Sequence, residues 1–120
     1  MKKPRIYADT SVFGGCFDEE FSEESKALFE DIKAGKFMLV VATTTLRELD
    51  NGPEYVQRIL ADLPPEMVEV INYSKEIGIL RDAYLEAGIV GNTCKADAEH
   101  VAAASVAEVD FIFVFIHQKR

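Results

Sequence analysis

Five consecutive apolar residues, at positions 37–41, restrict the fold of this chain more than any other segment. They do not alternate with polar residues, so the strand that they predict must be buried on both faces. Strands of this kind are typical of parallel sheets that helices cover on either side. Segments with helical spacing precede and follow this strand, and the alternation continues along the chain. The sequence therefore predicts an α/β fold with a central, mostly parallel sheet and right-handed crossovers.

The positions of apolar residues, glycines and prolines predict the individual elements. Strands are expected at residues 5–8, 37–41, 67–71 and 110–116. Helices are expected at residues 21–32, 43–51, 54–63, 75–87 and 96–108. The third strand should lie near an edge of the sheet, and Ser74 is the expected N-cap of the helix that follows it. A loop containing Gly14 and Gly15 is expected after the first strand.

The size and composition of the chain exclude several classes of protein. Its 120 residues, 48% of them hydrophobic, fit one domain at residues 1–120 with a substantial core. A net charge of −8 argues against a protein that coats nucleic acid, but not against an enzyme that reaches a phosphodiester through metal ions. Cys16 and Cys94 form no CxxC motif, so free thiols in a reducing cytoplasm are expected. The longest apolar run is too short to span a membrane.

Three acidic residues stand at comparable strand-to-helix junctions. Asp9 directly follows the first predicted strand, Glu48 lies in the helix after the second, and Asp97 begins the alanine-rich last helix. Ligand sites of α/β sheets lie at the carboxyl ends of the strands. An acid there is costly unless a cation, a hydrogen-bond donor or water compensates its charge. The three carboxylates could therefore meet at one edge of the sheet and hold a divalent metal ion.

Each of these acids also has a local explanation that the sequence leaves open. Asp9 could cap a turn or the next helix. Thr45 and Glu48 have the spacing of a capping box, which would place Glu48 in the first turn of its helix. Asp97 could compensate the dipole of the last helix. Each acid alone is weak evidence, and only their coincidence at three junctions favours a shared site.

Other charged residues near these junctions are given less weight. His100 follows Asp97 by three residues and is expected to be a surface or hydrogen-bonding residue rather than a metal ligand. Glu99 should point elsewhere than Asp97, because of the geometry of a helix. Arg47 and Lys95 lie close to the two later acids in the sequence. Together with the basic residues at the two ends of the chain, they could form a basic rim around an acidic centre, or they could simply be solvated side chains. The terminal residues are Lys2, Lys3, Arg5, Lys119 and Arg120.

Three segments together resemble the PIN-domain family, and most closely the small VapC-type toxin ribonucleases of bacterial and archaeal toxin–antitoxin pairs. They are residues 6–11 (IYADTS), 45–49 (TLREL) and 95–104 (KADAEHVAAA), the last followed by Val109 and Asp110. The segments occur in the family's order and span nearly the whole chain. The resemblance implies a PIN-like three-layer α/β/α fold.

The resemblance also implies a metal-dependent endoribonuclease that hydrolyses RNA phosphodiesters and is kept silent by a cognate antitoxin protein. Asp9, Glu48 and Asp97 would be its catalytic and metal-binding residues. Thr10 or Ser11 would orient the carboxylates through hydrogen bonds. Hard carboxylate oxygens without a cysteine or histidine ligand suit Mg²⁺ or Mn²⁺ rather than zinc. Homodimers are usual among such proteins, and no membrane association is expected.

One segment departs from the family pattern. Related proteins usually continue after the fourth strand with Ser or Thr, Trp or Arg, and then Asn or Asp, before a fifth strand. Here Phe115 or Ile116 stands where the polar metal-site residue is expected, so we expect about four strands and a truncated C-terminus. The alternative function is therefore a catalytically degenerate PIN-like module that binds a protein partner. A phosphatase of the haloacid dehalogenase type would need an acid where Ser11 stands.

Overall fold

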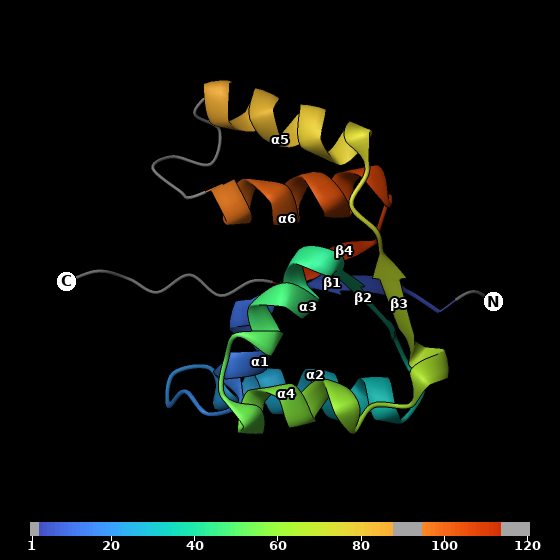
Figure 1. The fold of residues 1–120 in the computed structure, drawn as a ribbon. Helices are drawn as coiled ribbons and strands as arrows, with labels where there is room; N and C mark the ends of the chain where they lie inside the picture. Colours follow the sequence, from blue (N-terminus) through green and yellow to red (C-terminus); the bar gives the residue numbers. More distant parts are fainter. Residues whose placement is uncertain (1–2, 88–94, 114–120) are drawn as a thin grey trace.

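A computed structural model describes residues 3–87 and 95–113 of the chain, apart from the side chains of residues 95–97. Four parallel strands form one sheet in the order β3-β2-β1-β4. They are β1 (Arg5–Ala8), β2 (Met38–Ala42), β3 (Val68–Ile71) and β4 (Phe111–Phe113). Helices lie on both sides of this sheet, so the three-layer α/β/α arrangement that the sequence predicts is confirmed (Figure 1).

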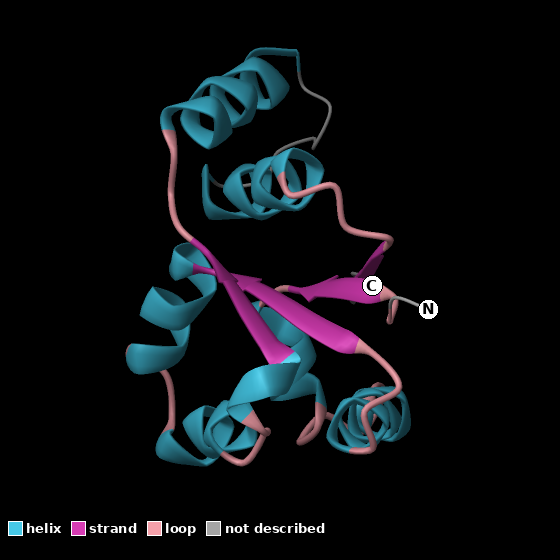
Figure 2. Cartoon of the chain, turned by 90° about the vertical axis from the view of Figure 1, so that its right-hand side faces the viewer, coloured by secondary structure: helices cyan, strands magenta, loops and turns pink. Residues whose placement is uncertain are grey.

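The helices divide between the two faces of the sheet. Helices α5 and α6 lie side by side over one face, and α1, α2 and α4 lie under the other (Figures 1 and 2). Helix α3 follows β2 directly at the carboxyl end of that strand. The bounds are α1 (Thr10–Gly15), α2 (Ser22–Lys33), α3 (Thr43–Asp50), α4 (Glu54–Ala61), the short 3-10 helix η1 (Pro65–Met67), α5 (Lys75–Ala87) and α6 (Lys95–Val106).

The alternation of side chains along β1 divides the core between the two faces. Ile6 and Ala8 pack into the cluster under the sheet, while Tyr7 packs into the cluster over it. This follows because successive side chains of a strand point to opposite faces. The upper cluster also contains three consecutive buried alanines of α6, Ala102, Ala103 and Ala104. Their small side chains let α6 lie close to the sheet.

The segment after β1 is not the loop that Gly14 and Gly15 predict. It is helix α1, which begins directly after Asp9 and contains both glycines. Val12 and Phe13 of this helix are fully buried. Each such buried side chain contributes about 1.5–3 kcal/mol, which outweighs the cost of about 1 kcal/mol for a glycine in a helix. Packing therefore decides a segment that local propensity assigns to a loop.

The edges of the sheet agree with the prediction as far as they are described. β3 forms one edge, as expected for the third strand. The fourth predicted strand is described only as Phe111–Phe113, and its residues 114–116 lie outside the described residues.

Cys16 is a buried free thiol, as the composition predicts, and Cys94 lies outside the described residues. None of the described helices is both long and apolar enough to cross a lipid bilayer.

Replacing the N-cap of α5 should have a measurable cost. The Ser74 hydroxyl accepts a hydrogen bond from the Ile77 amide at 3.2 Å, so Ser74→Ala should lower the free energy of unfolding by about 0.5–2 kcal/mol. Urea denaturation measures this. Ser105→Ala is the matched control, because the Ser105 hydroxyl donates to the Val101 carbonyl within α6 and contacts the Tyr84 hydroxyl at 3.4 Å, and caps no helix. Equal losses in the two variants would contradict a capping role.

Candidate functional site

Asp9 lies where the strand order reverses. The chain places β2 and then β3 on one side of β1, and β4 on the other. In open α/β sheets, ligands bind at the carboxyl ends of the strands at such a point. Asp9 occupies the N-cap position of α1, but its side chain makes no capping hydrogen bond. The Ser11 and Val12 amides at the start of α1 still act on this carboxyl group and lower its pKa, so the position of Asp9 suits both a helix cap and a cation site.

Burial changes the proton affinity of the Asp9 carboxyl group. Loss of solvation raises the pKa of Asp9 above its ordinary value of 3.8, and the Ser11 hydroxyl and the nearby His100 offset part of this rise. The Ser11 hydroxyl donates to Asp9 Oδ1 at 2.5 Å. A carboxylate that is poorly solvated by water, and whose negative charge neighbouring groups compensate only in part, is suited to binding a cation.

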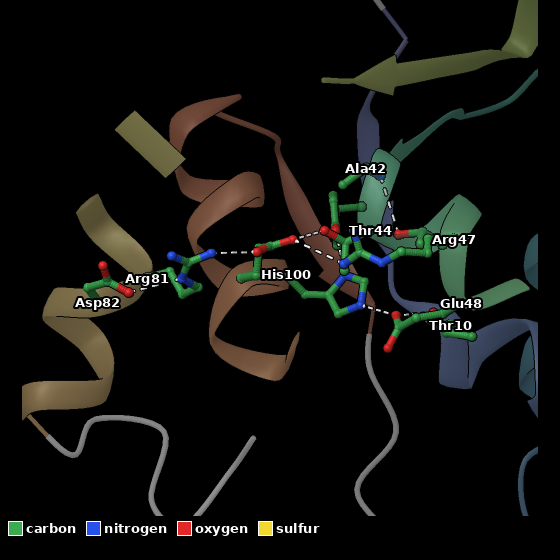
Figure 3. Close-up of polar contacts among 11 residues, drawn as sticks. Thr10, Ala42, Thr44, Arg47, Glu48, Arg81, Asp82 and His100 are labelled. Carbon is green, nitrogen blue, oxygen red and sulfur yellow. Dashed lines mark hydrogen bonds and ion pairs between the residues drawn. The ribbon is translucent and has the colours of Figure 1, made fainter. Parts of the chain in front are cut away.

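The carboxylate of Glu48 lies beside this junction. Its Oε1 accepts hydrogen bonds from Thr10 Oγ1 at 2.6 Å and from His100 Nε2 at 2.7 Å (Figure 3). Thr10 follows Asp9 in the sequence, so the structure brings Asp9 and Glu48 to the same end of the sheet. The charges of both acids also act on Tyr7, whose pKa they help to raise.

The capping-box interpretation of Glu48 is wrong. Helix α3 begins at Thr43, so Glu48 lies in its second turn rather than in the first. The Ala42 amide, at the N-cap position, donates to Thr45 Oγ1 at 3.3 Å instead. The start of α3 lies three residues earlier than the motif implies, because the helix follows β2 without a loop. The Glu48 side chain is therefore free to contact Thr10 and His100.

His100 is a site residue that the sequence reasoning missed. Of the two roles expected for it, hydrogen bonding is confirmed and a surface position is not, because the residue is 5% exposed. Its Nε2 contacts Glu48, and its Nδ1 lies 2.6 Å from the Tyr7 hydroxyl. One signal was present in the sequence. His100 stands three residues after Asp97, and residues three apart share a helix face.

Glu99, the neighbour of His100, faces a different set of partners. It is 6% exposed, and its Oε1 pairs with Arg81 Nη1 of α5 at 2.8 Å. Its Oε2 accepts from the Thr44 hydroxyl and lies 3.8 Å from Arg47 Nη2. Figure 3 shows Arg81 approaching from α5 on one side and Thr44 and Arg47 from α3 on the other. Glu99 therefore joins α3, α5 and α6 next to the candidate site.

The described side chains supply two of the three predicted carboxylates. Asp97 lies in the first turn of α6, and its side chain lies outside the described residues, as does that of Lys95. Among the described side chains, no three acids, histidines or cysteines gather as a metal-binding group. Asp9 and Glu48 supply hard oxygen donors, and each has one oxygen held by a neighbouring hydroxyl. This donor set fits Mg²⁺ or Mn²⁺ better than zinc.

Comparisons with known proteins test the fold. No protein-family model and no curated protein sequence matches the chain. The sarcin–ricin loop cleaving toxin VapC20 of Mycobacterium tuberculosis matches with a TM-score of 0.71 at 17% identity, over 92% of this chain and 89% of the toxin. The chain has the PIN-like fold of VapC toxins. A chain of Rickettsia felis VapBC2, solved with a DNA fragment from its promoter, matches with a TM-score of 0.55 at 15% identity, over 91% and 86% of the two chains.

The VapC-like fold confirms the resemblance that the sequence segments indicate. In this fold the predicted acids fall on separate elements, with Asp9 after β1, Glu48 on α3 and Asp97 on α6. The buried pair Tyr7 and His100 adjoins Glu48 in this chain.

Proposed function

We propose that this chain is a metal-dependent endoribonuclease of the VapC toxin type. The observation that supports it most is the arrangement of Asp9 and Glu48. Two carboxylates reach the same end of the sheet, at the point where the strand order reverses, in a chain with a VapC-like fold. RNA is the proposed substrate, and hydrolysis of its phosphodiester bonds is the proposed reaction.

The residues have separate roles in this proposal. Asp9, Glu48 and Asp97 would hold Mg²⁺ or Mn²⁺, directly or through water. The Thr10 hydroxyl holds Glu48 at 2.6 Å and the Ser11 hydroxyl holds Asp9 at 2.5 Å, so these two residues fix how the carboxylates present their oxygens. A bound divalent ion would lower the pKa of a water molecule and stabilise negative charge on the phosphate. No side-chain nucleophile is required.

The side chain of Arg47 favours an anionic substrate. Arg47 lies on α3 next to Glu48 in the sequence. Its side chain is 66% exposed, although Nη2 lies 3.8 Å from Glu99 Oε2. An exposed guanidinium beside a cation site can contact a phosphate with two donors. Arg47 is thus one member of the proposed basic rim. Such a local rim would let RNA approach a chain whose net charge is −8.

The partners in this proposal follow from the same fold. The Rickettsia felis match comes from a VapBC complex, which supports a cognate antitoxin as the protein partner of this chain. A homodimer and a cytoplasmic location complete the proposal, the latter because the cysteines form no CxxC motif and Cys16 is a free thiol.

Metal binding should stabilise the folded chain. A ligand that binds only the folded state adds about 2.7 kcal/mol at a concentration 100 times its Kd. For a domain of this size the Tm should rise by roughly 10 °C. Thermal melts with Mn²⁺, and with K⁺ at the same ionic strength, measure this; EDTA should reverse the shift.

Cleavage of RNA is the second half of this test. A structured RNA should be cut with Mn²⁺ present and should stay intact with EDTA. Cleavage that persists in EDTA would contradict metal dependence.

A second candidate is a PIN-like module that binds a protein and does not cleave RNA. Phe111 and Ile112 of β4 are 59% and 45% exposed, and among the described strands β4 pairs only with β1. An apolar strand edge can pair with another chain. Absence of both RNA cleavage and a Mn²⁺-dependent Tm shift would favour this module.

A further inference from the structure

Three side chains from three separate elements form a continuous hydrogen-bonded line. The Tyr7 hydroxyl of β1 lies 2.6 Å from His100 Nδ1 of α6, and His100 Nε2 lies 2.7 Å from Glu48 Oε1 of α3. Tyr7 is fully buried and His100 is 5% exposed. The two rings meet edge to face, with centroids 5.8 Å apart. The line therefore connects the core of the sheet to a carboxylate of the candidate site.

The chemistry of the three groups sets the direction of these hydrogen bonds. An ionised carboxylate only accepts, so His100 Nε2 must carry the proton that Glu48 receives. In the tautomer with its proton on Nε2 alone, the other nitrogen accepts, so the Tyr7 hydroxyl donates to Nδ1. A tyrosine hydroxyl is protonated at neutral pH, so it can serve as this donor. Each donor in the line thus has an acceptor.

Both donors to Glu48 reach the same oxygen. Thr10 Oγ1 and His100 Nε2 each contact Oε1, and among the described residues no hydrogen bond reaches Oε2. Two donors from different directions fix a carboxylate more firmly than one, because rotation about its terminal bond breaks both hydrogen bonds. The carboxylate is consequently held at one oxygen, and its other oxygen is left for a ligand.

We propose that Tyr7 and His100 are positioning residues for Glu48. They hold its Oε1 and leave Oε2 available to a divalent cation. The inference rests on the proposed function, because it takes Glu48 as a metal ligand. Neither residue touches substrate, and both act through the carboxylate of Glu48. Loss of such a partner of a metal ligand typically weakens metal affinity by about 10–100-fold.

Mn²⁺ titration of folded variants tests this inference. His100→Gln places an amide N–H near the position of Nε2 and should keep the Mn²⁺ affinity within about threefold, whereas His100→Asn is too short and should lose about 10–100-fold. Tyr7→Phe should lower the affinity as well. Tyr84→Phe is the matched control. The Tyr84 hydroxyl of α5 also contacts α6, at Ser105 and 3.4 Å, but it does not contact His100 or Glu48.

A second readout needs no metal. The chain has two histidines, so ¹⁵N resonances of the imidazole rings can be assigned with a His117→Gln variant. In metal-free protein His100 should carry a proton on Nε2. Tyr7→Phe should shift its Nδ1 resonance, and Tyr84→Phe should not.

The outcomes separate the two proposals. If wild-type protein binds Mn²⁺ and His100→Asn binds it equally well, the positioning role is wrong and the proposed function stands. A His100 ring protonated on Nδ1 alone in the metal-free protein, with no proton on Nε2 for Glu48, would also overturn the positioning role alone. If folded wild-type protein binds no Mn²⁺, both proposals fail together. Weak binding by His100→Asn with near-normal binding by His100→Gln supports the inference, because a merely structural role would lower the Tm of both variants without this difference.

Discussion

Asp9→Asn should abolish Mn²⁺ binding and RNA cleavage while it stabilises the metal-free protein. Loss of a residue that only supports a ligand weakens metal affinity by about 10–100-fold, so loss of a ligand itself should cost more than about 100-fold. Asparagine keeps an oxygen that can accept from Ser11, so the local hydrogen bond survives. It also removes a charge that is poorly solvated. Calorimetric Mn²⁺ titration and a cleavage assay measure the first effect.

The stabilising effect should depend on pH. The pKa of Asp9 is raised in the folded state, so the folded protein holds this proton more tightly than the unfolded chain does. Wild-type stability therefore falls, through this group, as the pH rises from the ordinary value of 3.8 through the raised pKa. Asp9→Asn lacks this loss, so its advantage in EDTA should be small at low pH and largest at neutral pH. Urea denaturation at several pH values measures the difference.

Asp18→Asn is the matched control for Asp9→Asn. Asp18→Asn carries the same chemical change in the segment before α2, where Asp18 accepts from the Glu20 amide at 2.8 Å. It should leave Mn²⁺ binding unchanged. If Asp9→Asn instead unfolds the metal-free protein, then Asp9 serves chiefly as a structural residue at the start of α1.

Arg81→Met should destabilise the fold strongly. The Arg81 and Glu99 side chains are 11% and 8% exposed and pair at 2.8 Å. Hydrogen bonds with Asp82 and Glu99 raise the pKa of Arg81, so it is always charged. Removing one partner of a buried pair costs about 3–5 kcal/mol, since the other charge stays buried and poorly compensated. Glu99 would keep only the Thr44 hydroxyl and Arg47 at 3.8 Å.

Thermal and urea unfolding in metal-free buffer measure this loss, which should lower the Tm by roughly 10 °C or more. Arg58→Met is the matched control. Arg58 pairs with Glu54 at 3.1 Å on α4, but the two side chains are 71% and 77% exposed, and exposed pairs of this kind contribute about 0.3–0.5 kcal/mol. The double variant Arg81→Met/Glu99→Met should regain most of the loss, because apolar residues can replace a buried pair. No recovery would mean that the pair organises α5 and α6 in another way.

Local patterns predicted much of the architecture because they record burial directly. The unbroken apolar run at residues 37–41 identified a strand buried on both faces, which is β2 at Met38–Ala42. β1 was predicted with the bounds that the structure has, Arg5–Ala8. The same patterns failed at α1, where two glycines indicated a loop. There the burial of Val12 and Phe13 depends on partners far away in the sequence, which no local window contains.

In the candidate site, too, local sequence patterns predicted some residues, while contacts between distant segments decided the others. Asp9 could be placed from the sequence, because it ends a recognisable strand. The contacts of Glu48 could not, since a threonine at the right spacing suggested a capping box that the actual start of α3 rules out. Nor could the pairing of His100 with Tyr7, which lie 93 positions apart. Such contacts depend on how closely α6 packs on the sheet.

Apart from α1, the sequence alone determined the order of the α-helices and strands and placed acids after the first two strands and in the last helix, because periodicity and helix-ending residues act over a few neighbours. Only the tertiary structure decided which oxygen of Glu48 is held, and by which donors. It also decided that Glu99 pairs with Arg81 rather than joining Glu48. Hydrogen bonds and ion pairs act over about 3–4 Å, so they are defined only once distant segments have been packed together.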